Sequence, residues 1–435
     1  GDHSGDYGSR SVGIIASTHD DFYFGTYDDA GNMLTNPAAF METDGAKKFL
    51  NFNEDGFAGI AEGGKYYTRD FDGKTAYRVI YRPNMIHPLV AFSTTCVGYA
   101  VDFFDTTLGA PKPLPASDQI WPIKAVFNSL VVIGLLIFMV SFTLVLLDTP
   151  VFSALRSGEI VQPAPVQDSG AKAWYWVLLI IGAVFSGSSF LFCMNTVYSK
   201  TTNFFVQTGP LTIGTWAALC GVFAIFCSAV FYGAYGKKHG WSARRAGLYL
   251  NLEQLWKTIA LAVIVIVVSF GLVFAAHYFF QVDYRMYVVA FKTFGADKVL
   301  IALRYLPFFL LFYVMNSISA NCFNYNTIGG KNGNILIFAF FNALGAIFVV
   351  ASQYIYFYAT GYQLYGLTEG QRIGPIWLFP CMVLLFVTPI MSRIIYKRTR
   401  NPYIAGLINA MFIVMISCSN TTTILGGGEL IATTF

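Results

Sequence analysis

The stretch Arg78-Val-Ile-Tyr-Arg-Pro-Asn-Met-Ile-His-Pro-Leu-Val-Ala-Phe-Ser93 joins two kinds of secondary structure in the first part of this chain. Residues 79–81 are β-branched or aromatic and predict a β-strand. Residues 82–84 end that strand, because proline removes a hydrogen-bond donor and asparagine favours turns. A periodic apolar run over residues 90–104 then predicts a helix. His87 is therefore expected on a loop that rigid elements hold, where functional groups are often mounted; an ordinary loop histidine is the alternative.

A second stretch, Val12-Gly-Ile-Ile-Ala-Ser-Thr-His-Asp-Asp-Phe-Tyr-Phe24, begins as a buried strand and continues into Asp20 and Asp21. A strand with a carboxylate after it, then a strand, a histidine and a helix, is the order in which α/β-hydrolases carry the last two members of their triad. On these two segments, residues 11–105 resemble the C-terminal half of an α/β-hydrolase fold serine hydrolase.

The resemblance implies a role for each residue. His87 is the general base, Asp20 orients its ring, and a serine attacks an ester or amide carbonyl without a cofactor. Asp21 is the alternative acid; the two aspartates point to opposite faces if the strand continues, and the alignment with the family favours Asp20. We expect the Asp20 carboxylate within roughly 2.6–3.2 Å of the His87 ring.

The nucleophile of such an enzyme is expected outside this sequence. The elbow motif G-x-S-x-G, which carries the serine upstream of the acid, is absent. Phe185-Ser-Gly-Ser-Ser-Phe190 lies in an apolar segment, where small residues favour close helix packing. The chain begins with glycine, so we expect the numbering to start partway through a longer protein.

Composition indicates a membrane protein. Of the 435 residues, 55% are hydrophobic and 12% are charged, against about 25% charged in soluble proteins. Residues 1–121 hold nine basic and 16 acidic side chains, which leaves 19 basic and eight acidic ones in the remainder. The net charge of +4 therefore does not favour nucleic acid as a partner, because the basic residues lie mostly beside apolar segments.

Two domains and a connector are predicted: a partial α/β-hydrolase-like domain (1–110), a Pro-rich connector (111–121), and an all-α polytopic membrane domain (122–435). Each predicted span is long enough to cross a hydrocarbon core of about 30 Å. The eight spans are 123–147, 174–197, 211–235, 256–279, 299–318, 334–358, 375–394 and 403–420. Within the first domain, residues 43–50 predict a short helix, and residues 66–81 predict a hairpin about an Asp-Gly turn.

Orientation follows from two basic segments, which we interpret as loops at 237–245 and 393–400. With eight spans both lie on one side of the membrane, and the positive-inside rule makes that side cytoplasmic. Residues 1–121 are then extracytoplasmic, in an integral protein of the plasma membrane. Membrane lipids are the expected partners, and an acyl ester or amide is the expected substrate.

Residues 316–326 gather asparagine and serine at the end of the fifth span. They either line a ligand site or satisfy the backbone of a helix end. No metal site is predicted, because neither CxxC nor HExxH occurs. Eight spans exceed what an anchor requires. A transporter or permease that carries an inert hydrolase-like domain is therefore the alternative function, and a binding module is a third.

Overall fold

The computed structural model describes residues 4–29, 32–112, 114–166, 168–424 and 430–431. The chain divides into two compact units, and each is described by itself. Unit 1 comprises residues 1–125 and 350–376, and unit 2 comprises residues 126–349 and 377–435. Unit 1 thus contains the segment expected to be hydrolase-like, and it also contains residues from more than 200 positions later in the chain.

A three-stranded sheet forms the centre of unit 1, in the order β1 (Val12–Ile15), β5 (Lys74–Tyr81), β4 (Tyr67–Phe71). β1 and β5 are parallel, and β4 and β5 form the predicted antiparallel hairpin. Its turn residues Asp72 and Gly73 both have positive φ, at 48° and 78°, a backbone conformation that the Asp-Gly pair adopts readily. The turn chemistry therefore explains why the hairpin was predictable.

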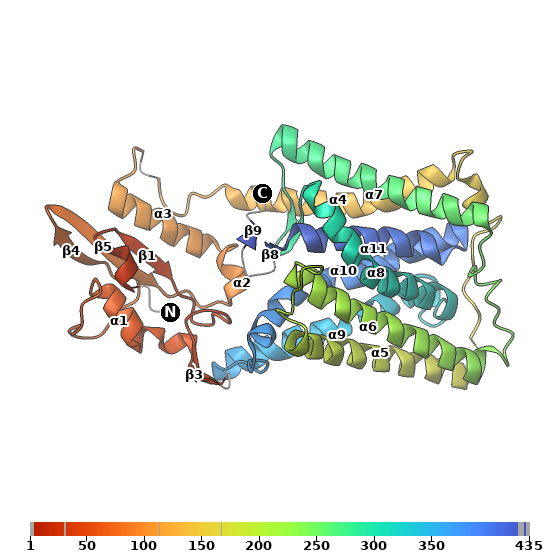
Figure 1. The fold of residues 1–435 in the computed structure, drawn as a ribbon, viewed down its shortest axis with the longest axis horizontal. Helices are drawn as coiled ribbons and strands as arrows, with labels where there is room; N and C mark the ends of the chain where they lie inside the picture. Colours follow the sequence, from red (N-terminus) through yellow and green to blue (C-terminus); the bar gives the residue numbers. More distant parts are fainter. Residues whose placement is uncertain (1–3, 30–31, 113, 167, 425–429, 432–435) are drawn as a thin grey trace. The chain divides into compact units, whose positions relative to one another are not determined.

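Helices cover both faces of this sheet (Figure 1). On one face, Ile80 packs against Phe49 and Leu50 of α1 (Asp44–Leu50). On the other face, the Tyr81 ring stacks on Tyr99 of α3 (Thr94–Leu108), with 4.5 Å between ring centroids. Successive strand residues point to opposite faces, so neighbours in β5 serve two separate packing layers.

The predicted α/β-hydrolase fold is not what the described sheets show. The central sheet contains a single parallel strand pair, and β2 (Thr26–Tyr27) and β3 (Met33–Thr35) form a separate two-stranded ribbon. The described chain is mostly helical. Besides α1 and α3, unit 1 contains the 3-10 helices η1 (Ser4–Tyr7) and η2 (Pro37–Glu42).

The predicted helix over residues 90–104 is two helices in the structure. A single-turn helix, α2 (His87–Val90), is followed by α3, whose first residue is Thr94. The Ser93 hydroxyl accepts a hydrogen bond from the Cys96 amide at 3.3 Å and caps α3. The prediction joined the two because the apolar spacing continues across the cap. His87 accordingly begins a helix instead of lying in an open loop.

Eight helices of the described chain are long and apolar enough to span a membrane, which indicates an integral multi-pass membrane protein. They are α4 (Trp121–Leu147), α5 (Ser169–Thr196), α6 (Thr208–Phe231), α7 (Leu252–Phe280), α8 (Asp297–Ile318), α9 (Gly330–Thr360), α10 (Glu369–Thr399) and α11 (Pro402–Ser419). The π-helical segments η4 (Tyr232–Gly236) and η5 (Ser319–Phe323) extend α6 and α8. The smaller elements are η3 (Ser153–Leu155), β6 (Tyr284–Met286), β7 (Val289–Phe291), β8 (Thr423–Ile424) and β9 (Leu430–Ile431).

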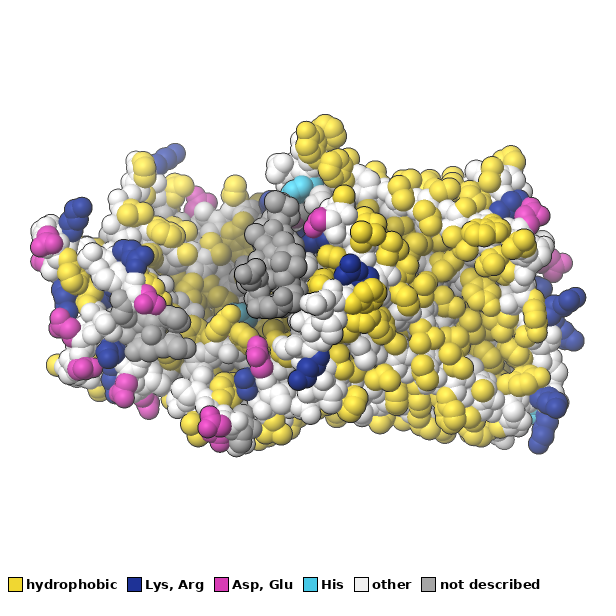
Figure 2. Space-filling model, viewed as in Figure 1, with side chains coloured by type: hydrophobic (Ala, Val, Ile, Leu, Met, Phe, Trp, Pro, Cys, Tyr) yellow, Lys and Arg dark blue, Asp and Glu magenta, His cyan; other side chains and the backbone are white. Residues whose placement is uncertain are grey.

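Packing within unit 2 is closest where helices carry small residues. α11 is the most buried span and packs against α7 and α8. A Cβ on Gly187 of α5 would lie 3.2 Å from the Gly345 carbonyl of α9, so glycine permits the close approach expected for residues 185–190. On the face that Figure 2 shows, hydrophobic side chains cover much of these helices, as lipid contact requires.

The two basic segments differ in structure. Residues 237–245 form the expected loop between α6 and α7, but residues 393–399 are the last turns of α10. The predicted 393–400 loop is therefore wrong as a loop. Only Arg400 and Asn401 join α10 to α11, and Asn401 caps α11 through its side chain. Lys397 and Arg398 lie in the last turn of α10, where basic residues are favourable.

Candidate functional site

The parallel pairing of β1 with β5 continues beyond both strands and brings two distant loops together. Within the strands Ile15 pairs with Tyr81, a separation of 66 residues. Beyond them the Thr18 amide donates to the Pro83 carbonyl at 2.9 Å, and His19 pairs with Ile86, a separation of 67. The segment that follows β5 is therefore one residue longer than the segment that follows β1. The extra residue lies at the break at residues 82–84, and it shifts the pairing of the two segments by one position.

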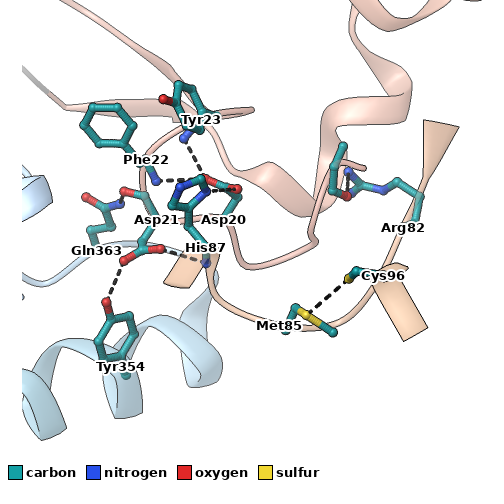
Figure 3. Close-up of polar contacts among 11 residues, drawn as sticks. Asp20, Asp21, Phe22, Tyr23, Arg82, Met85, His87, Cys96, Tyr354 and Gln363 are labelled. Carbon is teal, nitrogen blue, oxygen red and sulfur yellow. Dashed lines mark hydrogen bonds and ion pairs between the residues drawn. The ribbon is translucent and has the colours of Figure 1, made fainter. Parts of the chain in front are cut away.

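Asp20 and His87 follow this last pair and meet directly. Oδ2 of Asp20 lies 3.0 Å from Nδ1 of His87 (Figure 3). The other carboxylate oxygen accepts the amides of Tyr23 and Phe22, at 2.7 and 3.0 Å. The carboxylate is thereby held in one orientation, and only 2% of the Asp20 side chain is exposed. The expected distance between this acid and this histidine is confirmed, and their catalytic role stays a prediction.

The electrostatics of the pair favour a protonated His87 ring. The hydrogen bond that His87 Nδ1 donates to the Asp20 carboxylate raises the pKa of His87 above its usual value, although partial burial acts in the opposite direction. Because Nδ1 is bound to Asp20, Nε2 is the nitrogen left for a substrate or nucleophile. Within the part of the chain that the structure describes, Nε2 makes no hydrogen bond. The His87 side chain is 39% exposed, so a group from outside can reach it.

Asp21 contacts the backbone of His87 and not its ring. Its Oδ1 accepts the backbone amide of His87 at 3.0 Å, and its Oδ2 accepts the hydroxyl of Tyr354 at 2.6 Å (Figure 3). Gln363 donates its side-chain amide to the Asp21 carbonyl. Burial raises the pKa of Asp21 to about 6. Of the two acids left open by the sequence, Asp20 therefore binds the ring, and Asp21 positions the backbone.

Three positioning residues escaped the sequence analysis. Tyr354 and Gln363 lie more than 300 positions after Asp21, and no local pattern connects them with it. Arg82 donates to the Ala16 carbonyl at 2.9 Å and to the Pro37 carbonyl at 2.6 Å. This guanidinium fixes the chain just before the aspartates. Its place directly after a strand and before proline is a local signal that could have indicated such a role.

The asparagine-rich residues 316–326 form part of a second site, inside unit 2. Arg393 is 2% exposed, and its Nε donates to Oδ1 of Asn321 at 2.8 Å. A second guanidinium nitrogen donates to Oδ1 of Asn334 at 2.9 Å, and the third donates to the Ala320 carbonyl at 2.5 Å. The Tyr325 ring lies 3.9 Å from the guanidinium carbon. The cluster is thus a buried polar network and more than a helix end at the membrane surface.

A cavity of about 600 Å³ adjoins this network within unit 2. Residues of α5, α6 and α9, the segments at 161–166 and 235–246, and η5 form its walls. Asn321 and Tyr325, both in contact with Arg393, line it. Among the described residues no group of three His, Cys, Asp or Glu side chains could hold a metal ion in either site.

Comparison of the chain with known protein families, with characterised proteins and with solved structures found no match.

Proposed function

We propose that this protein is a membrane-embedded serine hydrolase and that unit 1 carries the acid and the histidine of its triad. The observation that supports it is the Asp20–His87 hydrogen bond of 3.0 Å, made by the segments that follow two adjacent parallel strands. The residues come from segments 67 positions apart, so the pairing is a property of the folded unit and not of local chain geometry. The partial α/β-hydrolase domain of the sequence analysis is part of this proposal.

The geometry supports different roles for Asp20 and His87. Asp20 keeps the proton of His87 on Nδ1, and Nε2 is then the acceptor that removes the proton from a serine hydroxyl. The serine oxygen attacks the ester or amide carbonyl, and His87 returns the proton to the leaving alcohol or amine. Water then hydrolyses the acyl-enzyme by the same proton transfers.

The attacking serine comes from outside residues 1–435. Ser17, close in sequence to Asp20, is fully buried and has no access to substrate. The exposed edge of the His87 ring is the side from which a serine on another segment or another chain approaches.

The membrane setting suggests a substrate class. Residues 1–120 precede the first span, the basic segment at 237–245 follows the third span, and the basic segment at 393–400 forms the end of the seventh span. By the positive-inside rule the hydrolase site is extracytoplasmic, on the outer side of the plasma membrane. A site held beside a bilayer suits amphiphilic, lipid-like acyl esters or amides.

Ester hydrolysis by the full-length protein in membranes is the experiment that tests the proposal. With p-nitrophenyl acyl esters, His87→Ala is expected to remove most turnover, by about 10³-fold or more. His277→Ala is the matched control, because His277 is an exposed histidine at the end of α7. An equal loss of turnover in His87→Ala and His277→Ala, or no loss in either variant, would contradict the proposed hydrolase function.

A transporter with an inert hydrolase-like unit is the second candidate. One observation favours it: the cavity of about 600 Å³ inside unit 2, lined by Asn316 and Asn321. Membrane-buried polar groups are costly and are commonly retained for ligand or ion pathways. If Asn316→Ala abolishes a solute flux at unchanged expression and unfolding temperature while His87→Ala leaves that flux intact, the transporter function is supported.

A further inference from the structure

Arg393 carries a buried positive charge that no described carboxylate neutralises. Its three guanidinium nitrogens bond to two asparagine side chains and one carbonyl, all of them neutral acceptors. No Asp or Glu in the described chain forms an ion pair with it. A buried cation of this kind is costly unless an anion or a dense set of dipoles stabilises it, so the cluster attracts negative charge.

The adjoining cavity has the composition of an anion site. Among the residues that the structure describes, its lining includes Arg245 and His239 but no aspartate or glutamate. Asn321 and Tyr325 separate the cavity from Arg393, because both line it and both contact the guanidinium. Arg245 in the described lining and Arg393 behind it are therefore two positive charges, and a carboxylate close to this wall, that of Asp168, is hydrogen-bonded to Tyr235. In a low-dielectric interior such charges act over longer distances than in water.

The part of the wall that α5, α6 and α9 form is largely apolar. Between α5, α6 and α9 the cavity is lined by Leu179, Phe185, Phe223, Phe338 and Phe341. A ligand that fills 600 Å³ therefore needs an apolar body as well as a charged group, since small ligand pockets bury most of their occupant. A fully hydrated inorganic anion lacks such a body.

Two π-helical segments lie in the wall of the same cavity. The two π-helical segments in the described chain, η4 and η5, both contribute residues to the cavity walls. π-Helical turns are rare and occur frequently at functional sites, because the extra residue re-aims side chains and frees backbone groups.

We propose that this cavity binds an amphiphilic organic anion, a carboxylate or phosphate monoester with an apolar tail. The carboxylate or phosphate group of the ligand lies toward Arg245 and toward Asn321 and Tyr325, where the positive charge of Arg393 attracts it. The tail lies among the aromatic residues of α5, α6 and α9. Arg393 is a positioning residue, which acts through Asn321 and Tyr325. The site lies within unit 2 and does not rest on the proposed hydrolase function.

Three ligands with the same eight-carbon chain test the charge preference: octanoate, octanol and octylammonium. Each is titrated calorimetrically into purified full-length protein in lipid nanodiscs, with empty nanodiscs subtracted. Octanoate is expected to bind saturably and at least tenfold more tightly than the other two. Octylammonium binding as tightly as octanoate overturns the proposal.

Two matched pairs of variants test the location. Gly182 lines the cavity, and nothing lies within 4 Å of its Cβ position, so Gly182→Leu is chosen to occupy the cavity; Gly271, also open at Cβ, gives the control Gly271→Leu in α7. Arg245 lines the cavity and Arg244 does not, so Arg245→Gln is compared with Arg244→Gln. Tenfold weaker octanoate binding is expected in the first member of each pair and less than a twofold change in the second. Wild-type affinity in Gly182→Leu overturns the location.

Solvent extraction and mass spectrometry then identify the source of the natural anion. An anionic lipid that co-purifies with the wild type, but not with Gly182→Leu, indicates a ligand from the bilayer. Octanoate binding without any such lipid indicates a water-soluble anion. Both results agree with the proposal and differ only in the source.

Discussion

Oδ2 of Asp20 lies 3.0 Å from Nδ1 of His87, although 67 positions separate the two residues. The next residue, Asp21, binds the backbone amide of the same histidine at the same distance. Two consecutive carboxylates thus hold one histidine by its ring and by its main chain. This arrangement fixes both the direction of the ring and the start of α2, and the following predictions depend on it.

The pH dependence of catalysis should report the Asp20–His87 bond. Asp20 raises the pKa of His87 above 6.5, and His87 must be neutral to act as a base. The value of kcat/KM of the full-length protein should therefore increase with pH, and the midpoint of this increase (the acid limb) should lie above pH 6.5. In Asp20→Asn the limb should move to lower pH, since the charge that stabilises the imidazolium is removed. Initial rates from pH 5 to 9 measure both limbs. An unmoved limb in Asp20→Asn contradicts the assigned pairing.

Asp21 should make stability depend on pH in the opposite sense to most carboxylates. Its folded-state pKa of about 6 exceeds the usual value of 3.8, so the folded protein keeps this proton while the unfolded chain loses it. Stability is then greatest below pH 3.8 and falls as pH rises to about 6, by on the order of 3 kcal/mol.

Asp21→Asn should remove this fall, because an amide keeps the hydrogen-bond geometry without titrating. The difference in unfolding temperature between Asp21→Asn and wild type should therefore grow in favour of the variant from pH 4 to pH 6. Asp118→Asn, at an exposed position, is the control and should show a constant difference. A constant difference in Asp21→Asn as well shows that Asp21 does not carry the effect.

Tyr354 should matter most when Asp21 is ionised. Its hydroxyl donates to Oδ2 of Asp21 at 2.6 Å, and Tyr354→Phe leaves that buried oxygen without its side-chain donor. A loss of about 1–3 kcal/mol is expected above pH 6, and a smaller loss is expected below pH 4. Tyr356→Phe, a half-exposed neighbour on the same helix, is the control and should cost about 0.5 kcal/mol or less. Thermal unfolding at both pH values measures the losses.

The membrane orientation can be tested by thiol labelling in intact cells. Lys74 begins β5 and Lys238 lies between α6 and α7, and both side chains are exposed. An impermeant maleimide should label Lys74→Cys and leave Lys238→Cys unlabelled until the cells are permeabilised. The wild type, with its seven free cysteines, gives the background. Equal labelling of both variants before permeabilisation would contradict the assignment of Lys74 and Lys238 to opposite sides of the membrane.

Local sequence signals predicted much of unit 1 and the spans. The Asp-Gly turn between β4 and β5 and the helix that Thr43 caps follow from short stretches with strong turn or cap chemistry, whereas the Asp20–His87 pair is expected from the resemblance to α/β-hydrolases. The eight spans follow from apolar length alone. Such signals suffice where neighbouring residues determine the backbone.

Features that arise from long-range packing could not be predicted in the same way. The bonds from Tyr354 and Gln363 to Asp21 depend on how residues 350–376 join unit 1. Arg393 resembles the first residue of a basic loop in the sequence, but in the structure neutral acceptors from η5 and α9 surround it. The cap at Ser93 interrupts an apolar periodicity that by itself predicts one continuous helix.

Labelling with a fluorophosphonate probe tests the central claim most directly, because it detects an activated serine without knowledge of the substrate. In full-length protein in native membranes, we expect one labelled serine outside residues 1–435, identified by peptide mass spectrometry. His87→Ala should reduce the labelling rate by about 10²-fold or more, since Nε2 removes the serine proton. His277→Ala should label like the wild type. No labelled serine, or equal labelling in His87→Ala and wild type, would contradict the assignment of Asp20 and His87 to a hydrolase.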